Sequence, residues 1–275
     1  MKKTAIITGA SSGIGAATVV QLLSDGWTVY ACARRTERMV ALAKQGAITL
    51  ELDVTSDASM QAVVETVLRQ STRIDALINN AGYGSYGALE DVPLEEGRQQ
   101  FEVNVFGLAR LTQLVLPAMR AQGAGKILNI TSVGGKIYEP LGSWYHATKF
   151  AVEGLSDCLR MEVKSFGIDI IVIEPGAIKT EWSGIAQQKV LEYSGATAYA
   201  EQAKQRAGML AYADSIASAP QVIATTISKA LKARKPKTRY AAGSGAFMIL
   251  LLRRLLPDRG FDWVMEYFAK QMASK

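Results

Sequence analysis

The feature that most restricts the fold is a glycine-rich turn between an apolar run and a helical pattern near the start of the chain. The run is Thr4–Thr8, the turn spans 9–15, and the helical pattern continues to Gly26. A second apolar run, 27–33, follows directly, so the unit is expected to be strand, helix, strand. The glycines permit a close backbone approach, and the helix N-terminus offers free N–H groups to a pyrophosphate. The unit therefore predicts a dinucleotide site, with a purely structural turn as the alternative.

The alternation of apolar runs and helical patterns continues along the chain. Further strands are predicted at 47–52, 75–78, 126–130, 169–173 and 240–242, and helices at 58–69, 94–120, about 143–166 and 221–233. This order is typical of an α/β protein with a parallel sheet and right-handed crossovers. We therefore expect a Rossmann-type, doubly wound parallel sheet in three layers, α/β/α. Since no linker or repeat interrupts the 275 residues, we expect 1–275 to form a single dinucleotide-binding domain.

Composition argues against several classes of function. One histidine, His146, and two cysteines, Cys32 and Cys158, cannot supply a standard zinc site, so no metal is predicted. The two distant cysteines fit a reducing cytoplasm. No G-x-S-x-G turn supports a serine hydrolase, and His146 is interpreted as structural. The net charge of +6 is dispersed, which argues against a nucleic-acid partner.

The last hundred residues are less regular. We expect residues 181–219 to form a mobile lid over the substrate, with an ordinary helical excursion whose aromatic side chains join the core as the alternative. An apolar helical extension is predicted at about 244–275. Its apolar run, 246–256, is too short to cross a bilayer. We favour a buried or subunit-interface helix there, and peripheral membrane contact is the alternative.

The end of the second strand determines the cofactor. In NAD-binding proteins an acidic residue about ~20 positions past the glycines holds the ribose 2′-hydroxyl. Here that position is Ala33, and Arg34 and Arg35 follow. Two guanidinium groups can clasp a 2′-phosphate, and Ser11 or Ser12 can add a hydroxyl. The sequence therefore predicts NADP(H); the alternative is that both arginines simply face water.

Tyr145 and Lys149 are candidates for proton transfer. On a helix, side chains four residues apart lie on one face. An ammonium beside a phenol stabilises the phenolate and lowers its pKa from about ~10, which would let Tyr145 act as a general acid or base. A solvated helix face is the alternative. Polar residues that follow other strands, namely Asp53, Asn80 and Ser132, are expected at the same edge of the sheet.

These residues together resemble the classical short-chain dehydrogenase/reductase family. The matches lie in the first two-thirds of the chain and in the family's order: Thr8-Gly9-Ala10-Ser11-Ser12-Gly13-Ile14-Gly15, Asp53, Asn79-Asn80-Ala81-Gly82, Asn104, Ser132, Tyr145-x-x-x-Lys149, Pro175-Gly176 and Thr180. Residues 82–90, 132–135 and 149–155 are more loosely similar to hydroxysteroid and retinol dehydrogenases.

The resemblance implies a role for each matched residue. Tyr145 would exchange the proton, Lys149 would lower its pKa and bind the nicotinamide ribose, and Ser132 would hold the substrate oxygen. Asn104 would hold a water that links Lys149 to solvent, and Asp53 would contact the adenine. The expected cofactor-binding residues are Gly9, Ser11, Ser12, Gly13, Ile14, Gly15, Arg34, Arg35, Asp53, Val54, Asn80, Ala81, Gly82, Tyr145, Lys149, Pro175, Gly176, Ile178 and Thr180.

The implied reaction is hydride transfer between NADP(H) and a carbonyl or secondary alcohol. A lipophilic small-molecule substrate, such as a steroid, a retinoid or a fatty aldehyde, is expected from the apolar and aromatic side chains of the lid segment. The resemblance also suggests a homodimer or homotetramer. The alternative function is an NADP(H)-binding sensor or scaffold without turnover.

Overall fold

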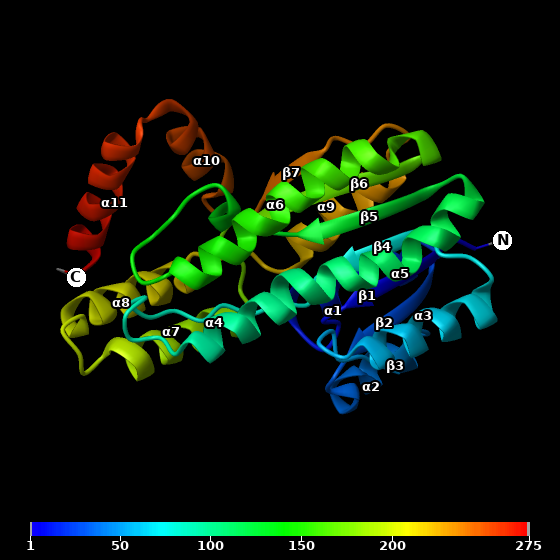
Figure 1. Cartoon of the computed structure of the whole chain (residues 1–275), viewed down its shortest axis with the longest axis horizontal. Helices are drawn as coiled ribbons and strands as arrows, with labels where there is room; N and C mark the ends of the chain where they lie inside the picture. Colours follow the sequence, from blue (N-terminus) through cyan, green and yellow to red (C-terminus); the bar gives the residue numbers. More distant parts are fainter. Residues whose placement is uncertain (1, 274–275) are drawn as a thin grey trace.

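Seven parallel strands form the centre of the molecule, in the order β3-β2-β1-β4-β5-β6-β7 (Figure 1). The computed structural model describes residues 2–273. The strands are β1 Thr4–Thr8, β2 Thr28–Ala33, β3 Ile48–Glu51, β4 Ala76–Asn79, β5 Gly125–Ile130, β6 Ile168–Pro175 and β7 Arg239–Ala242. The helices are α1 Gly13–Ser24, α2 Val40–Lys44, α3 Asp57–Ser71, α4 Leu94–Phe101, α5 Gly107–Gln122, α6 Ser143–Val163, α7 Glu181–Ser194, α8 Ala200–Ser215, α9 Gln221–Lys232, α10 Ala246–Leu255 and α11 Asp258–Ala273.

Both faces of the sheet are buried, which explains why its strands are apolar runs without polar alternation. Successive side chains of a strand point to opposite faces. Ala5 and Ile7 of β1 therefore join a core cluster with α1 and α9, whereas Ile6 joins a cluster with α3 and α5. The molecule is a single domain of three layers, as the sequence predicts.

The strand order reverses at β1, which pairs with β2 on one side and with β4 on the other. This switch point is where doubly wound sheets bind ligands, beyond the carboxyl ends of the strands. All seven strands occur where the sequence predicts them, within two residues at each end. Figure 1 shows α7, α8, α10 and α11 beyond the end to which β5 points, whereas the N-terminus lies at the opposite end.

The predicted helix over 94–120 is interrupted by a π-helical turn, Glu102–Phe106. There the Gly107 N–H donates to the Glu102 carbonyl, five residues back. Such turns add one residue to a helix and often occur at functional sites. The interruption places Asn104 at the bend, buried between α4 and α5.

Residues 181–215 form the ordered helices α7 and α8, with one short connection. Ala186 and Val190 of α7 pack with Ala203 and Leu210 of α8, and Trp182 packs against the same cluster. The segment is therefore helical, although Tyr212 is exposed and not part of the core. The mobile lid over the substrate stays a prediction. Small and apolar residues spaced along both helices explain the close packing, although the two segments carry weak helical periodicity.

The tail helix α10 is not part of the core. Ala246 is buried, but Phe247 is 75% exposed, Met248 60% and Leu255 69%. The prediction of a core helix is wrong because α10 follows the edge strand β7, beyond which the described part of the chain supplies little to cover it. A subunit-interface or membrane-surface role stays a prediction. Within residues 2–273, no helix combines the length and apolarity needed to span a membrane.

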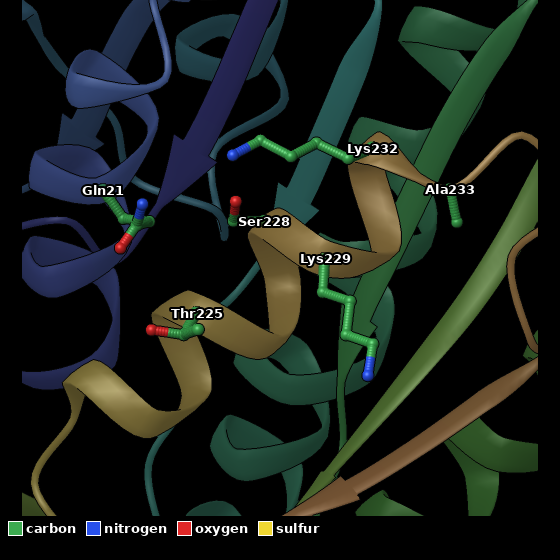
Figure 2. Close-up of a pocket in the computed structure, with 6 residues that line it drawn as sticks. All are labelled: Gln21, Thr225, Ser228, Lys229, Lys232 and Ala233. Carbon is green, nitrogen blue, oxygen red and sulfur yellow. The ribbon is translucent and has the colours of Figure 1, made fainter.

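A surface hollow of about 540 Å³ lies between α1 and α9. Figure 2 shows Gln21 on α1 facing the α9 side chains Ser228 and Lys232. Asp25, at the end of α1, accepts hydrogen bonds from the Ser228 hydroxyl at 2.5 Å and from Lys232 Nζ at 2.7 Å. These contacts neutralise Lys232 and fasten α9 to α1, so we assign the hollow a structural role.

Buried carboxylates at the end of β6 generate a prediction for stability. Glu174 is 5% exposed, and burial, with Glu153 as the next cause, raises its pKa from 4.5 to about 6. The folded state therefore binds a proton more tightly than the unfolded chain. This contribution to stability is complete below pH 4.5 and is lost as the pH rises through 6.

We expect Glu174→Gln to increase the free energy of unfolding at pH 7 by about 1–2 kcal/mol, and to flatten its pH dependence between 4.5 and 6. Urea unfolding of both proteins across this range measures the effect. A parallel pH dependence in the two proteins would contradict the assignment.

Candidate active site

The carboxyl ends of the strands border one cleft of about 840 Å³. It brings together nearly all of the site residues that the sequence predicts, from the ends of six strands, β1 to β6, and from α6. Those that line it are Gly9, Ser11, Ser12, Gly13, Ile14, Arg34, Arg35, Asp53, Val54, Asn80, Ala81, Gly82, Ser132, Tyr145, Lys149, Pro175, Gly176, Ile178 and Thr180. Gly15 and Asn104 lie behind the lining.

The glycine turn lets two backbone segments approach more closely than side chains would allow. Gly9 has φ +64°, and a Cβ on Gly15 would lie 2.3 Å from the Gly9 carbonyl oxygen. Asn80 Nδ2 donates to the carbonyls of Thr8 at 3.0 Å and Gly9 at 3.2 Å, which ties β4 to the turn. The first residues of α1, Gly13 and Ile14, therefore face the cleft. The cradle fits a dinucleotide diphosphate.

Arginine side chains gather beside this cradle. Arg35 donates to the Ser11 hydroxyl at 3.5 Å. The Thr55 backbone N–H is the main cause that lowers the pKa of Asp53, and the charge of Arg34 contributes to it. Arg38, which the sequence analysis missed, joins them on the short 3₁₀ turn after β2. Its spacing of four residues from Arg34 is the signal that could have identified it. Arg35 and Arg38 both pair with Glu181.

Tyr145, Lys149 and Ser132 meet at the centre of the cleft. Tyr145 and Lys149 are both buried on α6, and Lys149 Nζ lies 5.9 Å from the centre of the Tyr145 ring. That Nζ donates to the Ile130 carbonyl at 3.0 Å, at the end of β5. Ser132 follows the same strand, and its hydroxyl accepts from the Gly134 N–H at 3.0 Å. The helix and the strand end thus fix the three groups relative to one another.

The pKa of Tyr145 differs from the sequence expectation. Burial raises it to about 12, and the Ser132 hydroxyl opposes this rise. Burial also lowers the pKa of Lys149 to about 8. The prediction that the Tyr145 pKa is lowered is therefore wrong. Desolvation of the phenol dominates, and the Lys149 ammonium donates to the Ile130 carbonyl. At neutral pH, Tyr145 retains its proton.

Asn104 makes contacts that the sequence did not predict. Its amide nitrogen donates to the Tyr83 carbonyl at 2.9 Å and to the Thr148 hydroxyl at 3.1 Å. Its amide oxygen accepts from the Tyr83 N–H at 3.1 Å. The side chain thus holds the loop after β4 against α6. Both amide protons are committed to these protein groups, whereas the amide oxygen has a second acceptor position. The predicted water-binding role of Asn104 stays a prediction.

The outer wall of the cleft comes from segments that carried no motif. Trp182 and Ile185 of α7, with Met209 and Leu210 of α8, provide an apolar surface. The ring centre of Trp182 lies 5.0 Å from that of Tyr145. Helices α7 and α8 therefore cover the reactive centre, and sequence periodicity alone could not locate them there.

A buried ion pair joins this wall to the catalytic side. Arg206 of α8, 5% exposed, donates to Glu139 at 2.5 Å, and its guanidinium lies 4.7 Å from the centre of the Tyr86 ring. His146 Nε2 lies 3.7 Å from the same carboxylate, while its Nδ1 bonds to the Gly134 carbonyl at 2.9 Å. The predicted structural interpretation of His146 is consistent with these contacts, although its ring also borders the cleft.

A doubly wound sheet with a diphosphate cradle, and a tyrosine, a lysine and a serine in the same cleft, defines a nucleotide-dependent oxidoreductase. The sequence model described as "short chain dehydrogenase" matches residues 3–190. A probable short-chain type dehydrogenase/reductase of Helicobacter pylori, VdlC, is 34% identical over 94% of both chains. The chain belongs to the short-chain dehydrogenase/reductase family, whose members oxidise CH–OH groups or reduce C=O groups.

Other comparisons bear on substrate and cofactor. The NADPH-dependent 3-dehydrocapnine reductase of Ornithobacterium rhinotracheale is 32% identical over 98% of this chain and 99% of its own. The 3-ketodihydrosphingosine reductase of Bacteroides thetaiotaomicron is 32% identical over 96% of each chain. A short-chain dehydrogenase structure from Streptomyces avermitilis is 36% identical over 91% of each chain, with a TM-score of 0.79. A Burkholderia phymatum enzyme in complex with NAD is 25% identical over 92% of each chain, also with a TM-score of 0.79.

The close approach at the glycine turn can be tested by adding one methyl group. We expect Gly15→Ala to decrease the free energy of unfolding by roughly 1–3 kcal/mol, since the Gly9 carbonyl must move. Dinucleotide affinity should decrease about 10-fold or more, because the cradle amides move with it. Calorimetric unfolding and equilibrium binding measure the two effects.

Gly154→Ala is the matched control, because no described atom outside its own helical neighbourhood lies within 4 Å of a Cβ at that position on α6. It should stabilise the protein by about 0.5–1 kcal/mol and leave binding unchanged. Equal effects of the two substitutions would show that the turn tolerates a side chain.

Proposed function

We propose that the protein is an NADP(H)-dependent reductase of lipophilic ketones or aldehydes. The observation that carries the proposal is the buried Tyr145, which holds its proton at neutral pH beside Ser132 and Lys149. A protonated phenol in a cleft that contains a dinucleotide cradle is a proton donor for a developing alkoxide. Oxidation of the corresponding alcohol uses the same groups in reverse.

Each side chain has a defined task in this proposal. When bound, the nicotinamide cofactor supplies or accepts the hydride. Tyr145 donates its hydroxyl proton to the substrate oxygen as negative charge develops there. The Ser132 hydroxyl holds the same oxygen and stabilises that charge. The Lys149 ammonium, 5.9 Å from the centre of the Tyr145 ring, offsets part of the cost of the buried phenolate that forms after the transfer.

The tyrosine must then regain a proton from solvent. Lys149 is buried and its pKa is lowered to about 8, so it can both release and bind a proton near neutral pH. A water that serves Lys149 would donate to the Asn104 amide oxygen, which accepts the Tyr83 N–H and has a second acceptor position. In this proposal Asn104 shapes the relay by positioning Tyr83 and Thr148.

The arginines favour a cofactor with a 2′-phosphate. Ala33 leaves the end of β2 without a carboxylate, and Arg34, Arg35 and Ser11 line that end of the cleft. The NADPH dependence named for the Ornithobacterium relative supports this choice. The NAD complex of the Burkholderia structure shows that the fold also accepts the unphosphorylated cofactor, so the arginines carry the argument.

The apolar wall favours a lipophilic substrate. Trp182, Ile185, Met209 and Leu210 border the cleft opposite the glycine turn, and we assign α7 and α8 the role of a lid. The names of two relatives denote reduction of a ketone, which supports the direction of the reaction. The alternative of a sensor without turnover leaves unexplained why the buried Tyr145 and Lys149 share the cleft with Ser132.

We expect Tyr145→Phe to decrease turnover with NADPH and a panel of ketones and aldehydes by about 10²- to 10⁴-fold, because no other group donates the proton. NADPH affinity should change less than about twofold, since packing is retained. NADPH oxidation and equilibrium binding measure the two quantities. Tyr240→Phe removes a hydroxyl that bonds to the Lys237 N–H, outside the cleft, and is the control. Turnover by Tyr145→Phe at the wild-type rate would refute the role.

We expect Arg35→Ala to weaken NADPH binding about 10-fold, and NADH binding less than about twofold, because the guanidinium bonds to a charged phosphate in one case only. Arg98→Ala is the control, since Arg98 is an exposed arginine on α4 that does not line the cleft. Fluorescence titration gives both affinities. An equal loss for the two cofactors would place the 2′-phosphate elsewhere.

A further inference from the structure

Glu181 lies where a phosphate would meet the arginines. It is the first residue of α7, and its carboxylate accepts from Arg38 at 2.7 Å and from Arg35 at 3.4 Å. The three side chains are 44–50% exposed, so a ligand can reach them. The bond from Arg38 is the main cause that holds the pKa of Glu181 below its ordinary value, so the carboxylate is charged at neutral pH.

The start of α7 also lies across the diphosphate cradle. A Cβ on Gly13 would lie 2.9 Å from Thr180 Cγ2, so Thr180 touches the first residue of α1. The Thr180 hydroxyl accepts from the Trp182 N–H at 3.3 Å and begins α7. Trp182 in turn packs against Tyr145. Three consecutive residues thus connect the arginines, the cradle and the catalytic tyrosine.

A carboxylate with two oxygens on two guanidinium groups resembles a phosphate in charge and in hydrogen-bond geometry. Among the described ion pairs, Glu181 is the carboxylate that Arg35 and Arg38 contact, and Arg34 adds a third positive charge at the end of β2. The pairing with Glu181 therefore occupies Arg35, which the proposed function assigns to the 2′-phosphate, together with the neighbouring Arg38.

We propose that Glu181 competes with the 2′-phosphate for Arg35 and Arg38 and thereby limits the preference for NADP(H) over NAD(H). This inference rests on the proposed 2′-phosphate site. A phosphorylated cofactor must displace the carboxylate, which frees the start of α7, whereas an unphosphorylated cofactor leaves the pair in place. Glu181 is thus a specificity-determining residue that reduces the discrimination between NADP(H) and NAD(H). It also couples the adenosine end of the cleft to the lid.

The test uses two fragments that reach only the adenosine end, 2′,5′-ADP and 5′-AMP, with binding measured by titration calorimetry. Glu181→Gln keeps the shape of the side chain and removes its charge. We expect the substitution to increase the affinity for 2′,5′-ADP about 3- to 10-fold, because the ligand no longer has to break one or two exposed ion pairs. The affinity for 5′-AMP should change less than about twofold. Glu192→Gln, which removes an exposed carboxylate at the other end of α7, is the control and should change neither affinity.

Two outcomes would overturn the inference. Unchanged or weaker binding of 2′,5′-ADP to Glu181→Gln would show that the carboxylate does not compete, or that it orients the arginines instead. An equal change for both fragments would show a general role in stabilising α7. If the wild-type protein does not prefer 2′,5′-ADP over 5′-AMP, the proposed 2′-phosphate site itself fails, and this result is separate from the effect of the substitution.

Hydrogen exchange tests the coupling to the lid. In the wild-type protein, 2′,5′-ADP should accelerate exchange of the first amides of α7, and 5′-AMP should not. In Glu181→Gln these amides should exchange rapidly without ligand. Slow exchange at the start of α7 in the unliganded variant would contradict the coupling.

Discussion

The site depends on how closely β4 and the glycine turn approach each other at the switch point of the sheet. Asn80 closes this approach with its amide, which bonds to two carbonyls at the end of β1. The Thr8 hydroxyl accepts the N–H groups of Asn80 and Ala81 in return, at 3.0 and 2.9 Å. These bonds leave room for glycine alone at position 15 and turn the N-terminus of α1 toward the cleft. The other groups of the site are arranged around this fixed corner.

Much of this architecture was predictable because parallel strands end at one edge. Once the strand before Ser132 and the helix that carries Tyr145 are identified, topology brings them together without any side-chain information. The apolar runs are unusually clear because both faces of the sheet are covered. Gly9 and Gly15 were also recognisable from the sequence. The positive φ of Gly9 favours glycine, and the backbone contact at Gly15 leaves no room for a side chain.

The properties that failed prediction depend on burial and on partners from distant segments. The Tyr145 pKa could not be inferred from its spacing to Lys149, because desolvation acts on the phenol and the ammonium alike. The contacts of Asn104 require the π turn, which no sequence period indicates. The pairing of Glu139 with Arg206 joins residues 67 positions apart. Such pairs appear only when the packing of α8 is known.

The pairing of Glu139 with Arg206 also restricts how the lid of this protein can be replaced. The two halves of the ion pair lie on different parts of the chain, one beside the catalytic helix and one on the lid. A buried pair tolerates the loss of one member poorly, because the remaining charge stays desolvated. A lid segment transplanted from a relative would therefore need to bring its own partner for Glu139. A change of substrate range through the lid of this protein would therefore require paired substitutions across the cleft, and not exchange of the lid as an independent module.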